Sequence, residues 1–393
     1  MTMTTDAPAP IGPSSRVGIP QDHRGSWIPT GAMIAARFKE LRRRRGLMVA
    51  LLTVTVGIPA IYLTIRLLLH AAAPHSYGPA GGFNQYVGLV AGVLYVFGFI
   101  VAATLGATAG SADLTEGMFR HHVITGRSRI ALYLARIPAG LAIIMSLVAI
   151  GFTIVCAVCV FAAPTSLEYN GVHVPAQLSR TEFQQWAAEH AQEVVNSFPI
   201  DISSRDRIAN PACLPGGGPG FGPGGGVIKQ PGGTAATPCT PAQLQAMAVF
   251  IAKQDYTDYA RVFLYPSDSL MVKTGLWIEL EAIIGFMVGL GLSSLLGQRT
   301  IAVILLIVLE LIITPIAARA RLPHLSNLQR AVVGLATAHL EPGGLPTPFG
   351  GGGSPAERSL LLHESTTVAV CVIVAWIVAW TALGAWRMMT RDA

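Results

Sequence analysis

The sequence predicts an all-α membrane protein with about six transmembrane helices, an N-terminal interfacial helix and an inserted extracytoplasmic helical domain. Hydrophobic residues make up 52% of the 393 residues and charged residues only 12%, whereas ordinary soluble domains carry about 25% charged residues. A chain of this composition cannot cover a water-exposed surface with polar groups. Its apolar residues also fall into long runs, which indicates that lipid surrounds them.

Six apolar runs come close to the roughly 20 residues that a helix needs to cross a bilayer. Only Gln298, Arg299 and Thr300 separate the fourth run from the fifth, so one long kinked element is the alternative for that pair. We expect no signal peptide, because the first run is too long for one and follows a polar start. Spans one to three are predicted at about 47–69, 85–110 and 137–163, within region 47–163. Spans four to six are predicted at about 272–297, 301–319 and 365–386, within region 272–393.

Two different segments precede the first span. Residues 1–28 are rich in Pro, Ser, Thr and Gly and have no apolar period, so we expect a disordered cytoplasmic tail. In residues 29–46, Ile34, Phe38 and Leu41 fall on one side of a helix and basic residues supply the charge. This pattern predicts an amphipathic helix that lies against the membrane surface.

Arginine-rich segments determine the predicted orientation. The loop 70–84 has no Lys or Arg, whereas segments on the opposite side of the membrane carry many. The loop 320–364 is mildly basic and opposes this assignment, but the contrast with 70–84 outweighs it. We therefore expect a multi-pass protein of a bacterial plasma membrane with both termini in the cytoplasm. The net charge of +6 reflects this asymmetry, and we expect no nucleic-acid partner.

Segment 164–271 is predicted to be a small extracytoplasmic domain between spans three and four. Ser179 and Glu182 form a capping-box pattern that opens a helix through about Phe198. Thr240 and Pro241 are typical of the N-cap and first position of a second helix, through about Phe263. A Gly/Pro tract separates the two helices and should form a loop.

Cys213 and Cys239 lie on either side of that Gly/Pro tract. On the oxidising side of a membrane they are expected to form a disulfide. Closing this loop would contribute about 3 kcal/mol. Two free thiols are the alternative.

The loop 320–364 contains a further helical pattern at about 325–340, with Leu328, Ala331, Val332 and Leu335 on one face. A Gly/Pro stretch follows it. We expect a short exterior helix pair that dips into the edge of the membrane.

The link between spans two and three combines an acidic-Gly pair, a turn and basic residues. Glu116-Gly117 opens a short amphipathic helix, Gly126 to Arg129 reverse the chain, and Arg136 follows one helical stretch later. A polar helix at the membrane surface can dock into a groove on a partner. A solvated connecting loop with arginines on the inner side is the alternative.

This order of elements resembles the permease subunit of an ABC-2 type transporter. Glu116, Gly117, Arg129 and Arg136 stand where that family has Glu, Gly, Arg and a basic residue, while Gly126 replaces the family's Pro. The resemblance implies a dimer of permease chains, coupled to a cytoplasmic ATP-binding subunit and exporting an amphipathic cargo. The coupling residues it implies are Asp113, Glu116, Gly117, Arg120, Arg127 and Arg129.

The chain is expected to be a non-catalytic subunit. It has no Gly-x-x-x-x-Gly-Lys-[Ser/Thr] motif, so the chain needs no cofactor of its own, and ATP and Mg²⁺ would bind the partner ATPase. An intramembrane enzyme is disfavoured, because the spans contain no paired Asp and no Ser/His arrangement. The alternative function is a membrane-anchored sensor or assembly scaffold that uses the insert at 164–271 to bind a ligand or protein.

Acidic residues inside the spans are candidates for a substrate cavity, since an aspartate at the bilayer centre costs about 2.5–3.5 kcal/mol. Glu310 falls near the middle of span five, and Glu279 and Glu281 lie in span four. The last two point about 200° apart on a helix, so both cannot face one cavity. We expect Glu310 and Glu279 to line the cavity. The alternative is a protonated or hydrogen-bonded carboxyl at a helix interface, which we favour for Glu281.

Small residues recur at four-residue spacing within the spans and let helix backbones approach closely. They predict tight packing within one chain, with a dimer seam as the alternative. Cys156 and Cys159 are interpreted as small packing residues rather than a redox pair. The small pairs are Gly88 and Gly92, Gly106 and Gly110, and Gly285 and Gly289.

Overall fold

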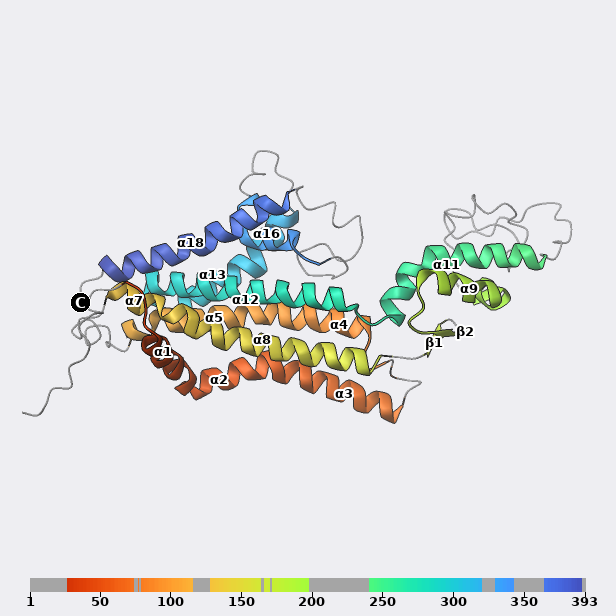
Figure 1. Cartoon of the computed structure of the whole chain (residues 1–393), viewed down its shortest axis with the longest axis horizontal. Helices are drawn as coiled ribbons and strands as arrows, with labels where there is room; N and C mark the ends of the chain where they lie inside the picture. The colour runs from red at the N-terminus through yellow and green to blue at the C-terminus, as the bar shows by residue number, and fades with distance from the viewer. Residues whose placement is uncertain are drawn as a thin grey trace, which may run out of the picture.

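The computed structural model describes residues 27–73, 77, 79–115, 128–163, 166–169, 172–197, 240–319, 329–342 and 364–390. Six of its helices are long and apolar enough to cross a membrane, which confirms the predicted number of such helices. They run side by side along the long axis of the molecule (Figure 1). The end of the last span and the first helix lie at one end of this bundle, and the two short strands 166–169 and 172–175 lie beyond the other.

The first two spans each contain a π-helical turn. Span one consists of α2 (Arg45–Leu52), η2 (Thr53–Gly57) and α3 (Ile58–Ala72). Span two consists of α4 (Phe83–Leu89), η3 (Val90–Tyr95) and α5 (Val96–Thr115). Span three is the longest, with α7 (Arg129–Leu134) leading directly into α8 (Arg136–Phe161).

The last three spans are α12 (Asp268–Leu296), then α13 (Arg299–Val308) with η6 (Leu309–Ile313) and α14 (Thr314–Arg319), and finally α18 (Thr366–Thr390). Spans four and five are separate helices, as predicted. The chain reverses at Gly297, whose φ of 73° is left-handed and suits a residue without a side chain. The alternative of one long kinked element is therefore wrong.

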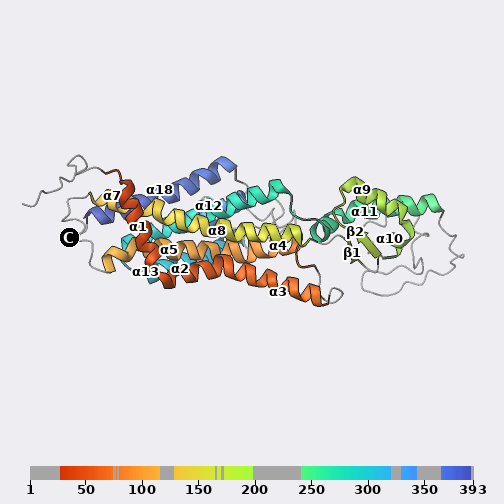
Figure 2. The same cartoon turned by 60° about the horizontal axis from the view of Figure 1, so that its bottom comes forward.

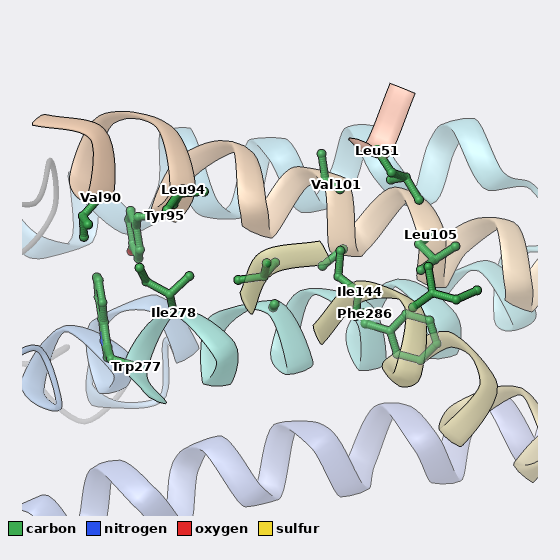
Figure 3. Packing of buried hydrophobic residues seen from close by; sticks show 14 of the residues in the cluster. Leu51, Val90, Leu94, Tyr95, Val101, Leu105, Ile144, Trp277, Ile278 and Phe286 are labelled. Atoms are coloured by element: carbon green, nitrogen blue, oxygen red, sulfur yellow. The ribbon is translucent and has the colours of Figure 1, made fainter. Parts of the chain in front are cut away.

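The helices α5 and α12 approach one another closely through glycines on both. A Cβ added to Gly289 would lie 2.5 Å from the carbonyl oxygen of Ala103, and one added to Gly285 would lie 2.9 Å from that of Phe99. Gly106 and Gly110 of α5 approach α12 as closely. Figure 3 shows Leu105, Ile144 and Phe286 meeting beside this contact. The prediction of tight packing within one chain is confirmed for these two glycine pairs.

The pair Gly88 and Gly92 behaves differently. No atom lies within 4 Å of a Cβ added to either residue. The prediction of tight packing within the chain is therefore wrong for this pair. Cys159 is buried in the main core and Cys156 packs against it, in agreement with their interpretation as packing residues.

The predicted N-terminal helix is α1 (Gly31–Arg43), which Figure 2 shows running across the spans rather than along them. Its buried residues are Met33, Arg37 and Leu41. Met33 packs against residues of α7, among them Ala131 and Leu132. The helix thus presents one face, which includes Arg37, to the bundle and carries the exposed basic residues Lys39, Arg42 and Arg43 on the rest.

Segment 166–264 has a hydrophobic core of its own. It contains a hairpin of β1 (Ser166–Tyr169) and β2 (Val172–Pro175), followed by α9 (Arg180–Glu189), α10 (Ala191–Ser197) and α11 (Pro241–Phe263). The hairpin departs from the all-α prediction. Both predicted helix starts are confirmed, because Ser179 and Thr240 each cap a helix through a capping box. The hydrogen bonds with Ser179 hold the pKa of the Glu182 carboxyl below its ordinary value.

One tyrosine joins the hairpin to the helices of this segment. The Tyr259 hydroxyl donates to the carbonyl of Pro175 at 2.7 Å and accepts from the amide of Leu178 at 3.0 Å. Its ring stacks on Phe183 with centroids 4.1 Å apart. Burial raises the pKa of Tyr259 to about 12.

Replacing Tyr259 by phenylalanine should therefore destabilise this segment by about 1–3 kcal/mol, because a buried donor and acceptor lose their partner. Hydrogen exchange of α9 and α11 in the detergent-solubilised chain measures the loss, and the exposed Tyr265→Phe serves as the control. The raised pKa gives a second signature. The neutral Tyr259 hydroxyl stabilises the folded segment fully below pH about 10, the pKa of an unfolded tyrosine. This stabilisation is lost as the pH rises through the folded-state pKa of about 12. Equal exchange in both variants would contradict this role.

Candidate functional site

A short buried helix, α16 (Val333–His339), lies between spans five and six beside the N-terminal half of α18 (Figure 1). It corresponds to the described part of the helix predicted at about 325–340. All residues from Val333 to Ala338 are buried. A helix this short cannot cross the bilayer, and it is enclosed by the spans around it.

Three side-chain hydrogen bonds hold α16 and the residues 329–332 before it in place. Trp277 Nε1 of α12 donates to the carbonyl of Thr337 at 3.1 Å. Trp376 Nε1 of α18 donates to the carbonyl of Ala331 at 2.8 Å. Gln329 Nε2 donates to the carbonyl of Ala317 in α14 at 3.0 Å. Spans four, five and six are thus each tied to this one segment.

Glu310 lies in the π-helical turn η6 and faces α16. Its side chain is 4% exposed. The Tyr95 hydroxyl donates to Glu310 Oε1 at 3.3 Å. A Cβ added to Gly334 of α16 would lie 2.8 and 2.9 Å from the two carboxyl oxygens. The carboxyl is therefore packed inside a single chain, between the backbone of α16 and a tyrosine of span two.

Glu281 of α12 is the second carboxyl at this place. It is 2% exposed, and it lies within electrostatic reach of Glu310 and within hydrogen-bonding reach of the Thr337 side chain. Its Oε1 atom has no hydrogen-bond partner among the described residues. Glu341, directly after α16, also acts on Glu281.

The structure thus brings Glu281, rather than Glu279, next to Glu310. Glu279 is two residues from Glu281 and consequently points to another side of α12. It is only partly buried. Of the two predicted cavity residues, Glu310 alone lies in this cluster, and the structure places it inside the packing of one chain.

An aromatic pair lies alongside the two carboxyls. The rings of Tyr95 and Trp277 are stacked with centroids 4.8 Å apart and an angle of 5° between their planes. Figure 3 shows these two side chains facing one another across the gap between their helices. Neither residue is among the site residues predicted from the sequence. Trp277 comes four residues before Glu281, a spacing that places the two on one face of a helix.

At the opposite end of the bundle, two arginines of span three bond to neighbouring spans. Arg129 Nη1 donates to the carbonyl of Met389 in span six at 3.0 Å. Arg136, which is 2% exposed, donates from Nη1 to the carbonyl of Gly110 in span two at 3.1 Å. The Ser294 hydroxyl of span four donates to the same carbonyl at 3.3 Å.

Several predicted site residues fall outside these contacts. Asp113 belongs to the last turn of α5, but its side chain lies outside the described residues. So do Glu116, Gly117, Arg120 and Arg127 of the link and both cysteines of the predicted disulfide, Cys213 and Cys239. Within the part of the chain that the structure describes, no group of three or more His, Cys, Asp or Glu residues is arranged to hold a metal ion.

No family model, curated protein or solved structure matches the chain.

Proposed function

We propose that this chain is the permease subunit of an ATP-driven exporter of the ABC-2 type. In this proposal a separate subunit hydrolyses ATP, two permease chains pair in the membrane, and an amphipathic cargo passes between them. The six spans, the transverse helix α1 and the short helix α16 between spans five and six support it by their order along the chain. The sequence pattern of the link, with Glu116 and Arg129, supplies the family resemblance.

The observation that carries this proposal is the attachment of span three, which directly follows the link, to spans two and six. Arg129 and Arg136 begin the two helices of span three, and they bond to span six and span two respectively. A push on the link from the cytoplasmic side would therefore move spans two, three and six together. Such a joint is what an ATPase needs in order to act on a membrane partner.

Purification tests the proposal directly. The tagged chain is extracted in mild detergent from the membranes of its own host, and the co-purifying proteins and their ATP hydrolysis are measured. An ATPase chain with a Gly-x-x-x-x-Gly-Lys-[Ser/Thr] motif is expected in stoichiometric amount. Glu116→Lys should reduce the bound ATPase at least about tenfold, which corresponds to about 1.4 kcal/mol of binding free energy.

The matched control is Glu189→Lys, which makes the same charge change at an exposed position of α9. It should leave the amount of bound ATPase unchanged. If the unsubstituted chain brings down no ATPase, the permease proposal is wrong. If Glu116→Lys and Glu189→Lys retain equal amounts, the link does not couple the subunits.

A sensor or assembly scaffold is the second candidate, favoured by the separate core of segment 166–264. Phe183, Trp186, Tyr256 and Tyr259 stack within this core, which contains no residue of the six spans. In that case the phenotype of the cell would be unchanged by Glu116→Lys and lost with changes in the insert. Glu116→Lys and a substitution in the core of the insert, each scored for membrane insertion and for the phenotype of the cell, therefore separate the two functions.

A further inference from the structure

The two carboxyls beneath α16 lack a counter-charge within the described part of the chain. Glu281 from span four and Glu310 from span five act on one another. The other ionisable groups that face them are Tyr95 from span two and Glu341 after α16. Span six offers only Cys371 between Thr366 and Ile377, and that side chain is exposed. His339 is 3.5 Å from Glu364 and is occupied there. No basic side chain among the described residues acts on either carboxyl.

Two adjacent carboxylates in such a place are strongly unfavourable. Burial penalises each charge, and the two charges repel one another in a medium of low dielectric constant. Either a cation binds beside them or a proton neutralises them. The space around the two carboxyls decides whether a cation or a proton neutralises them.

The backbone of α16 leaves no room for an organic cation on its side of Glu310, and no group of three or more His, Cys, Asp or Glu among the described residues is arranged to hold a metal ion. Gly334 is so close that a Cβ added to it would fall 2.8 Å from a carboxyl oxygen of Glu310 and 2.7 Å from Cγ2 of Thr314. A proton needs no such space. It also supplies what Glu281 lacks, because the buried Oε1 without a partner becomes a hydrogen-bond donor or accepts one from its neighbour.

We propose that Glu281 and Glu310 form a proton-binding site that holds at least one proton while α16 is seated on it. The site does not depend on the proposed function, since it concerns contacts within one chain. Loss of the proton would place two negative charges beneath the backbone of α16. Proton binding and the seating of α16 are therefore thermodynamically linked, and each favours the other.

Infrared difference spectroscopy of the full chain in detergent tests this site. A protonated carboxyl has a carbonyl stretching band that carboxylates lack and that shifts in D₂O. The unsubstituted protein is expected to show this band at pH 7. At least one of Glu281→Gln and Glu310→Gln should lose about half of its intensity or more, and the double variant should lose it all apart from contributions of other groups.

Glu279→Gln is the matched control, because it removes a carboxyl from the same helix on another side. It should leave the band of the pair unchanged. An unsubstituted protein without the band at pH 7, or a folded double variant that retains all of it, overturns the proposal.

A second variant keeps the test decisive if the glutamine substitutions prevent folding. Tyr95→Phe removes the hydroxyl that donates to Glu310 and leaves both carboxyls in place. Because a lost hydrogen bond changes the stretching frequency of the carbonyl, the band should shift in this variant. A band at the same position in Tyr95→Phe and in the unsubstituted protein would assign it to other groups and overturn the proposal.

Discussion

Replacing Gly106 by leucine is expected to abolish the accumulation of folded protein. A Cβ at this position would collide with the backbone carbonyl of Phe286 and lie 3.0 Å from the backbone nitrogen of Leu290. Both atoms belong to α12, so no flexible side chain can move aside. The two central spans must separate, and overpacking of this kind costs at least about 3 kcal/mol.

The measurement is the yield of monodisperse protein in size-exclusion chromatography after detergent extraction. Gly88→Leu is the matched control, because it adds the same side chain to the same span where no atom lies within 4 Å. Its yield should stay within about twofold of the unsubstituted chain, since surface changes usually cost less than about 0.5 kcal/mol. A normal yield of Gly106→Leu would mean that α5 and α12 do not pack as described.

The comparison of these two glycines shows what the sequence could predict about the bundle. Spacing alone marks Gly88, Gly92, Gly106 and Gly110 as equivalent, because a local pattern identifies a face but not its neighbour. The structure distinguishes them, since only the second pair meets α12. The six spans and both caps of the insert were predictable because length, hydropathy and capping are local properties.

The acidic cluster illustrates the same limit at the candidate site. Helix geometry correctly required Glu279 and Glu281 to face different ways. It could not show which of them would meet Glu310, because that depends on the rotation of α12 against span five. Trp277 carried a usable signal, since an aromatic residue and a carboxyl four apart inside an apolar span share one face.

The hairpin could have been predicted. Asn170 and Gly171 separate the two strands in the sequence, and Asn-Gly between short runs with β-branched and aromatic residues is the strongest local signal for a two-residue turn. Val172 and Val174 are buried while His173 is exposed, which is the alternation of a half-buried strand. The helical patterns on either side of this segment obscured it.

Replacing Arg136 by alanine should destabilise the arginine-rich end of the bundle by about 3 kcal/mol. The side chain is among the largest that are fully buried, and its guanidinium donates to Gly110 from inside the bundle. Its removal loses a hydrogen bond from a charged donor, worth about 1.5–3 kcal/mol. It also leaves a cavity, which adds to the cost. Thermal unfolding of the detergent-solubilised chain measures the effect.

Arg299→Ala is the control, because it removes an exposed arginine between spans four and five and should change stability by less than about 0.5 kcal/mol. Arg136→Lys separates charge from geometry. A lysine keeps the charge but cannot reproduce the planar fork of donors, so it should recover only part of the loss. Full recovery by lysine would show that the positive charge alone suffices. In that case the bond to Gly110 would not be what attaches span three to span two, and the mechanical link proposed between the ATPase and the spans would rest on Arg129 instead.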